Sequence, residues 1–141
     1  SMAAALAAGA DGVRIGTRFL ATPESAAHPD YVAALLAADA ESTVLTETFS
    51  AGWPEAPHRV LASAVAAALA HRGDNVGSFA GEPLPRLSAR TPSREVTGAI
   101  NAMALYAGQG VGQIDQVVPA EQIMADLTGG ALQLLQRWAG P

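Results

Sequence analysis

The hydrophobic positions of the chain recur mostly at helical spacing. Between residues 29 and 39, Val32, Leu35 and Leu36 stand at positions i, i+3 and i+4, which is typical of one face of a surface helix. Residues 57–72 show the same spacing and are followed by a glycine, a common stop signal. We therefore expect a helix over the first stretch and a helix of about four turns over the second.

The second half of the chain combines further helical spacing with turn-rich sequence. Residues 73–93 contain many glycines and prolines without any period, which predicts an irregular loop. Helical spacing returns over residues 94–106. A last helix is expected to enter through Pro119 and to continue to Trp138, with a break at the pair Gly129–Gly130.

Two stretches are predicted to be extended. Residues 42–49 are rich in β-branched side chains and end in a glycine and proline turn, so they indicate a short strand. Near the N-terminus, a helix over residues 2–8, with Ser1 as N-cap and Gly9 as stop, leads at once into the apolar strand 13–15. This order is the second half of a β-α-β repeat, so we expect the chain to be a segment of a longer protein.

The composition fits one helix-rich body. The chain has 141 residues, of which 50% are hydrophobic and 5% aromatic, so it is long and apolar enough to form a core. Alanine supplies much of the apolar content, and this residue suits close-packed helices better than a sandwich of large alternating side chains.

The charge pattern argues against nucleic acid and membrane partners. The formal net charge is -5 at pH 7, and the charges are spread singly, without a basic stripe or a cationic face. No apolar run has the length of a membrane span and no signal-peptide pattern opens the chain, so we expect a cytoplasmic protein. Cysteine is absent, which excludes disulfides and thiolate metal sites within this chain.

A glycine and a threonine follow the expected strand 13–15, at the strand end where ligands bind in parallel α/β barrels. Gly16 lets backbone amides approach a phosphate without a Cβ in the way, and Thr17 adds a hydroxyl donor. A following helix N-terminus would add its positive dipole end. The alternative interpretation is that Gly16 and Thr17 only terminate a buried strand.

The glycine-rich run of residues 107–113 is the second candidate site. Gly108, Gln109 and Gly110 offer backbone amides and a side-chain amide just beyond an expected helix end. A cofactor or substrate contact is one interpretation. The other is a helix-ending loop in which the glycines adopt left-handed conformations.

The histidines carry no catalytic or metal-binding pattern. His28 precedes a helix, His58 lies in an expected first helical turn, and His71 lies in an expected last turn. We interpret all three as structural or solvated. No pair of them has metal-ligand spacing with a carboxylate, so no metal site is expected.

Other residue types give no further site. The aromatic residues Tyr31, Trp53, Tyr106 and Trp138 are widely spaced, so we expect core or interface packing rather than a stacking platform. The acidic residues form no pair at a glycosidase-like spacing, and no Gly-x-Ser-x-Gly elbow occurs.

Residues 3–20 resemble one family pattern nearly position by position. They read AAALAAGADGVRIGTRFL and are similar to the pattern shared by the nitronate monooxygenases (2-nitropropane dioxygenase family) and the FMN-dependent enoyl-ACP reductases. Residues 28–31, 43–46 and 107–112 occur in the order and approximate spacing expected of the C-terminal portion of the nitronate monooxygenases. The resemblance therefore covers most of the chain.

The resemblance implies an α/β fold, namely the C-terminal segment of a TIM (β/α)8 barrel with a mainly helical extension. It places the last barrel unit at about residues 1–22 and the extension at about residues 23–141. In that family FMN lies over the barrel mouth, and Gly16 and Thr17 match the second of two turns that hold its phosphate. Gly108 and Gln109 would form a wall of the active site.

The implied function is that of part of an FMN-dependent oxidoreductase, which oxidises alkyl nitronates with molecular oxygen. Its expected partners are a small-molecule substrate, oxygen and the remaining N-terminal barrel half. The catalytic histidine of the family belongs to an earlier strand, so we assign no catalytic residue here and expect this segment alone to be inactive. An FMN-dependent enoyl-ACP reductase and a non-catalytic helical interaction module remain as alternatives.

Overall fold

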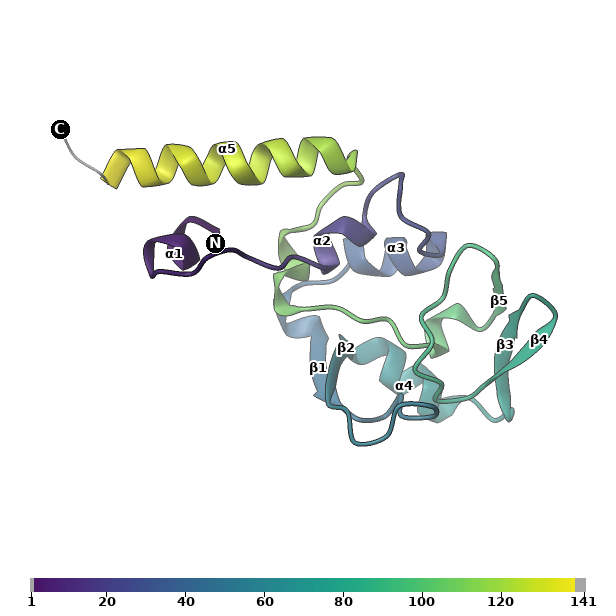
Figure 1. Cartoon of the computed structure of the whole chain (residues 1–141). Coiled ribbons are helices and arrows are strands. Elements are labelled where there is room, and N and C mark those ends of the chain that lie inside the picture. Colours follow the sequence, from purple (N-terminus) through teal and green to yellow (C-terminus); the bar gives the residue numbers. More distant parts are fainter. Residues whose placement is uncertain (1, 139–141) are drawn as a thin grey trace.

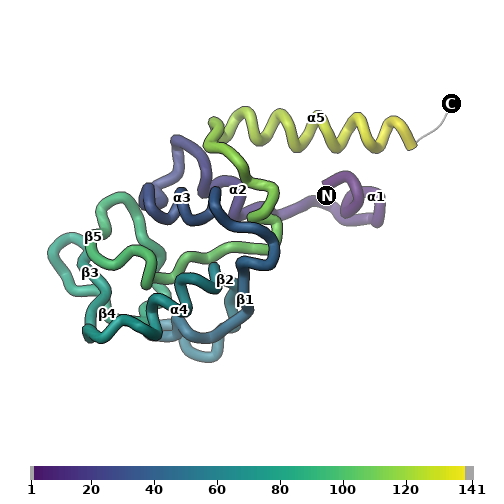
Figure 2. Tube along the Cα trace, turned by 180° about the vertical axis from the view of Figure 1, so that it is seen from behind, coloured from purple at the N-terminus to yellow at the C-terminus, as the bar shows by residue number. Residues whose placement is uncertain are grey.

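A long helix runs along one side of the molecule, with a short helix beside it, and the other elements form a body of short helices and small sheets (Figures 1 and 2). The computed structural model describes residues 2–138, so the expected N-cap Ser1 lies outside the described residues. The helices are α1 Met2–Ala7, α2 Thr17–Leu20, α3 Pro29–Leu36, α4 Ala62–Ala70 and α5 Ala120–Trp138, with the 3-10 turns η1 Ala40–Ser42, η2 Ile100–Ala102 and η3 Gln109–Gln113.

The strands form two small antiparallel sheets. They are β1 Thr43–Thr46, β2 His58–Leu61, β3 Asn75–Phe79, β4 Glu82–Pro85 and β5 Val96–Gly98. In the first sheet β1 pairs with β2, and in the second β3 lies between β4 and β5. The part of the chain after residue 22 therefore combines helices with two small antiparallel sheets, most of whose strands were not expected from the sequence.

Three of the expected elements are confirmed. The N-terminal helix ends at Gly9, which has a φ of 94° and donates its N–H to Leu6 at 3.0 Å. Helix α3 begins with Pro29 at its first position, and the His28 side chain accepts a hydrogen bond from Asp30 N. The β-branched stretch near residue 43 forms β1.

The expected four-turn helix over residues 57–72 is wrong in its first part. There β2 pairs with β1, and only Ala62–Ala70 is helical. The adjacent apolar residues Val60 and Leu61 are both buried in the strand, and Leu61 N donates to Leu105 O at 2.9 Å. A short apolar run satisfies helix and strand spacing equally, so tertiary pairing decides between them.

The irregular loop expected over residues 73–93 contains a hairpin instead. Strands β3 and β4 are joined by Ala80 and Gly81, whose φ angles of 51° and 85° are those of a type I′ turn. The helix expected over residues 94–106 is likewise replaced by β5 and η2. Pairing of β5 with β3 overrides the helical spacing of that segment.

The predicted strand 13–15 and the predicted helix break at Gly129–Gly130 are also corrected. Residues 13–15 are irregular and pair with no strand within residues 2–138. A strand needs a neighbouring strand to complete its backbone hydrogen bonds. Helix α5 continues unbroken through both glycines over 19 residues. An interior glycine costs only about 1 kcal/mol relative to alanine and leaves the helical hydrogen bonds intact.

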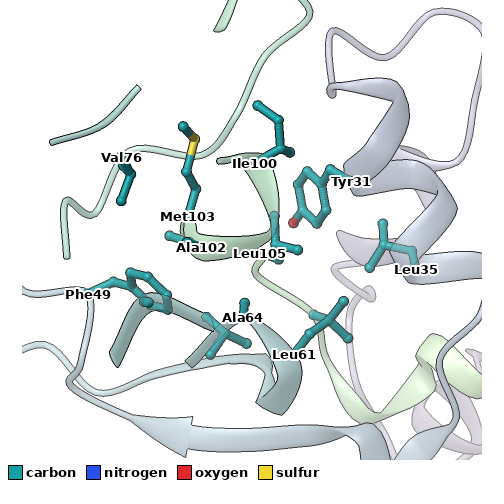
Figure 3. Close-up of a cluster of buried hydrophobic side chains, with 14 of the residues drawn as sticks. Tyr31, Leu35, Phe49, Leu61, Ala64, Val76, Ile100, Ala102, Met103 and Leu105 are labelled. Carbon is teal, nitrogen blue, oxygen red and sulfur yellow. The ribbon is translucent and has the colours of Figure 1, made fainter. Parts of the chain in front are cut away.

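The core lies between α3, α4, η2 and the start of the glycine-rich run (Figure 3). Its fully buried members include the following side chains: Tyr31, Leu35, Phe49, Leu61, Val96, Leu105 and Val111. Tyr31 is the polar member of this cluster, and its hydroxyl donates to Tyr106 O. Through this bond α3 is tied to the segment that leads into Gly108.

Stability should fall in alkaline solution because of Tyr31. Burial, and next the neighbouring Tyr106, raise the pKa of the Tyr31 hydroxyl. An unfolded tyrosine loses its proton at pH ~10, whereas folded Tyr31 keeps its proton. Tyr31 therefore contributes fully to stability below that pH, and this contribution is lost as the pH rises above it. Urea denaturation from pH 7 to 11 should therefore show a falling free energy of unfolding, with a weaker fall in Tyr31→Phe. Equal slopes in both proteins would contradict this.

Candidate functional site

The two turns that were predicted to bind a cofactor lie against each other. Gly108 N donates a hydrogen bond to Thr17 Oγ1 at 3.0 Å, across 91 positions of sequence. A Cβ added to Gly108 would lie 3.6 Å from the same oxygen, so the two segments are in close contact. Of the four residues proposed from the sequence, the structure thus brings Gly16, Thr17 and Gly108 together.

Gly16 precedes the short helix α2 and leaves an open space above its Cα. Its backbone angles are φ -109° and ψ -70°, so glycine is not needed there for conformational reasons. A Cβ at this position would meet nothing within 4 Å. The N–H groups at the beginning of a helix have no acceptor within the helix, so the amides of Gly16 and Thr17 are left without an intrahelical partner.

The hydroxyl of Thr17 has a proton to donate. Its oxygen already accepts from Gly108 N, and within residues 2–138 no acceptor lies within hydrogen-bond distance of its O–H. A hydroxyl carries one donor and two acceptor positions, so the bond to Gly108 orients Thr17 while its proton stays free.

Two cavities meet at this turn, and Gly16 and Thr17 line both. The larger has a volume of about 560 Å³ and extends between residues 13–18 and helix α5. The smaller has a volume of about 300 Å³ and is also lined by Arg59, Tyr106 and Gly108. Gln109 lines neither cavity and is exposed at the start of η3, so its predicted cofactor contact stays a prediction.

Arg59 is the charged residue that the sequence analysis missed. It lies half-buried on β2, and its Nη1 donates to Thr43 O at 3.3 Å and to Thr43 Oγ1 at 3.1 Å. The segment was expected to be helical, which would have placed this side chain on an ordinary solvated face. Nothing in the local pattern indicated that Arg59 would share a cavity with Thr17 and Gly108.

The histidines are held by local hydrogen bonds, in agreement with a structural role. His58 is buried, with Nδ1 2.8 Å from Ala56 O and Nε2 3.4 Å from Phe49 N. Phe49 N–H donates to Nε2, so the neutral tautomer with a proton on Nδ1 satisfies both contacts. His71 Nε2 lies 2.9 Å from Asn75 O.

The wide spacing of the aromatic residues in the sequence did not predict that Trp53 and Tyr106 come together around His58. Trp53 stacks on His58 with ring centroids 5.9 Å apart, and Tyr106 meets His58 edge-on at 5.4 Å. Trp53 and Tyr106 themselves lie 6.4 Å apart. The turn at residues 50–54 folds back and brings the three rings together beside the smaller cavity, which Tyr106 lines.

Within residues 2–138, no group of three or more histidine, cysteine, aspartate or glutamate side chains has a metal-binding arrangement. In the same range, no helix combines the length and hydropathy that crossing a membrane requires.

Backbone amides, a free hydroxyl and an arginine around an open glycine turn define a candidate anion-binding site. The sequence pattern of the family described as nitronate monooxygenase matches residues 1–130, and the chain belongs to that family. The resemblance noted from residues 3–20 is thereby confirmed.

The chain is also similar to a solved structure. It is that of a mutant of FabK from Thermotoga maritima, with 26% sequence identity and a TM-score of 0.61. The match covers 99% of this chain and 39% of the FabK chain. This chain therefore spans about two-fifths of the length of that protein.

Proposed function

We propose that this chain supplies one phosphate-binding turn and part of the pocket wall of an FMN-dependent oxidoreductase. The observation that carries the proposal is the hydrogen bond between Gly108 N and Thr17 Oγ1, which joins the two glycine turns predicted from the sequence. Membership of the nitronate monooxygenase family supports a flavin cofactor. The last barrel unit at about residues 1–22, followed by an extension, remains our proposal for the domain arrangement.

The residues present fit a phosphate group. The Cα of Gly16 faces open space that any larger residue would fill, and the free Thr17 hydroxyl and the amides of α2 are donors, as a phosphate oxygen requires. The lining of the smaller cavity contains Arg59 and no carboxylate. These features would hold the phosphate end of FMN, with Gly108 fixing the orientation of Thr17.

When bound, FMN accepts electrons from an organic substrate and transfers them to a second substrate. The chain's own residues bind and orient the cofactor. Thr17 and the amides near Gly16 anchor the cofactor, and Tyr106 contributes an aromatic wall to the adjoining cavity. None of the three histidines, all within residues 2–138, lines either cavity at the turn, so we propose that the remaining barrel half supplies the group that abstracts the proton.

We propose alkyl nitronates as substrates and molecular oxygen as the electron acceptor, because the family match is to the nitronate monooxygenases. The alternative is an FMN-dependent enoyl-ACP reductase, which the similarity to FabK favours. Oxygen uptake with propyl nitronate should exceed NAD(P)H oxidation with a crotonyl thioester in the natural protein that carries this chain. Activity only with the thioester would overturn the nitronate assignment.

A non-catalytic interaction module is the candidate of a different class. It would bind a partner chain through its alanine-rich faces and hold no flavin. Visible absorbance near the flavin bands in the purified natural protein separates the two classes, since a module would show none. We also expect that protein in the cytoplasm, which fractionation tests.

The Thr17 side chain should matter for cofactor affinity through its hydroxyl and not through its shape. Thr17→Val keeps the shape but removes the acceptor of Gly108 N–H and the free donor. Because a hydrogen bond to a charged group contributes about 1.5–3 kcal/mol, FMN affinity should fall about tenfold or more. Thr17→Ser should retain wild-type affinity. Titration of FMN fluorescence measures both, and unchanged affinity in Thr17→Val would contradict the proposal.

A further inference from the structure

We infer that Arg59 is a further phosphate-binding residue and supplies the positive charge that makes this site select FMN over riboflavin. The inference rests on the proposed function, because it concerns the same cofactor. It assigns the phosphate to the smaller of the two cavities that meet at Gly16, where Arg59, Thr17 and Gly108 share one lining.

The backbone of Arg59 is tied to the segment that carries the glycine turn. Ala107 N donates to Arg59 O at 3.1 Å, and the next residue, Gly108, donates to Thr17 Oγ1. One short run of chain therefore holds the backbone of Arg59 close to the side chain of Thr17. Strand β2 holds Arg59 on its other side, through the pairing with Leu45 of β1.

The guanidinium is oriented but its charge is not neutralised. Its Nη1 donates to the carbonyl and hydroxyl oxygens of Thr43, both uncharged. Within residues 2–138 no carboxylate lies within ion-pair distance of Arg59, and the cavity lining contains no acidic residue. A half-buried cation without a counterion favours an anion beside it.

The arginines of the larger cavity are placed differently. Arg18 donates to Gln116 O at 3.1 Å and to Ala21 O at 3.5 Å, so it links α2 to the segment before α5. Arg14 lines the larger cavity together with Asp126, whose carboxylate opposes anion binding there. The smaller cavity is the more favourable place for a phosphate dianion.

The guanidinium of Arg59 and the phosphate of FMN have matching chemistry. A guanidinium keeps its charge at any ordinary pH and offers several N–H donors in a planar fork, of which Nε and Nη2 have no acceptor among the described residues. With Thr17 O–H as a further donor, the site presents a charge-assisted set of hydrogen bonds to phosphate oxygens. Riboflavin has the same ring and ribityl chain but lacks this anion.

The test compares FMN with riboflavin in the natural protein that carries this chain. Both dissociation constants are measured by fluorescence titration for the wild type, Arg59→Gln and Arg59→Lys. We expect the wild type to prefer FMN, and Arg59→Gln to reduce that preference about tenfold or more with riboflavin affinity unchanged. Arg59→Lys, which keeps the charge without the fork, should lie between them.

Two other arginines serve as controls, and Arg86 is the one matched to Arg59 in burial. Arg86 is a half-buried arginine bonded to a backbone carbonyl, Ala68 O at 3.4 Å, and lines neither cavity at the turn. Arg86→Gln should leave the preference for FMN unchanged. Arg14→Gln should do the same, because the larger cavity does not hold the phosphate.

The contrary outcomes distinguish failure of the inference from failure of the proposed function. Equal loss of FMN and riboflavin affinity in Arg59→Gln would show a structural role and refute the inference. Loss of the preference in Arg14→Gln instead would move the phosphate to the larger cavity and refute it as well. A wild-type protein that binds neither flavin would refute the proposed function itself.

Discussion

In the natural protein that carries this chain, Gly16→Val should give a variant that folds but is purified without flavin. The valine side chain would occupy the open space above Gly16 and exclude a phosphate from the amides of α2. Loss of two or more hydrogen bonds to a charged group corresponds to a weakening of FMN binding by about a hundredfold or more. The flavin content of the purified variant, read from its visible absorbance, measures the effect.

Folding should be almost unaffected by this substitution. The φ of -109° at Gly16 suits any residue, and a Cβ there meets no described atom within 4 Å. Gly129→Val is the matched control, since Gly129 also has open space around it but lies in α5 away from the turn. A Gly16→Val protein that retains stoichiometric flavin would contradict the phosphate assignment.

Gly77→Ala should strongly destabilise the protein. In the second sheet, a Cβ on Gly77 would lie 1.9 Å from Thr97 O and 2.8 Å from Met103 Cε. The oxygen belongs to the paired strand β5 and cannot move without breaking that ladder. We expect the free energy of unfolding to fall by about 3 kcal/mol or more, as urea denaturation would measure.

The same substitution in a helix gives the control. Gly129→Ala adds a methyl group where nothing lies within 4 Å, and alanine is the better helix former. The free energy of unfolding should rise by up to about 1 kcal/mol. If Gly77→Ala left stability at the wild-type value, the close pairing of β3 and β5 would be incorrect.

Local patterns predicted the elements whose signals lie within a few residues. The stop at Gly9 and the start of α3 at Pro29 depend on local backbone geometry, and both are correct. Residues 58–61 and 96–98 were expected to be helical but pair as strands with partners that no local window contains. In these segments the tertiary pairing determines the structure.

The candidate site also combines residues that local sequence signals predicted with one that depends on tertiary pairing. Gly16, Thr17 and Gly108 were proposed from glycine chemistry and from the family resemblance, and the bond between Thr17 and Gly108 brings them together. Arg59 could not be proposed in this way, because its place beside the turn depends on the pairing of β2 with β1. The sequence therefore indicated the hydrogen-bond donors of the turn but not the positively charged Arg59 beside it.

The central claim is that the turn around Gly16 and Thr17 holds the phosphate of FMN. A crystal structure of the natural protein soaked or copurified with FMN tests it most directly. We expect a phosphate oxygen within about 3.2 Å of Thr17 Oγ1 or of a backbone nitrogen at Gly16 or Thr17. A phosphate bound elsewhere, with this turn contacting only protein or solvent, would contradict it.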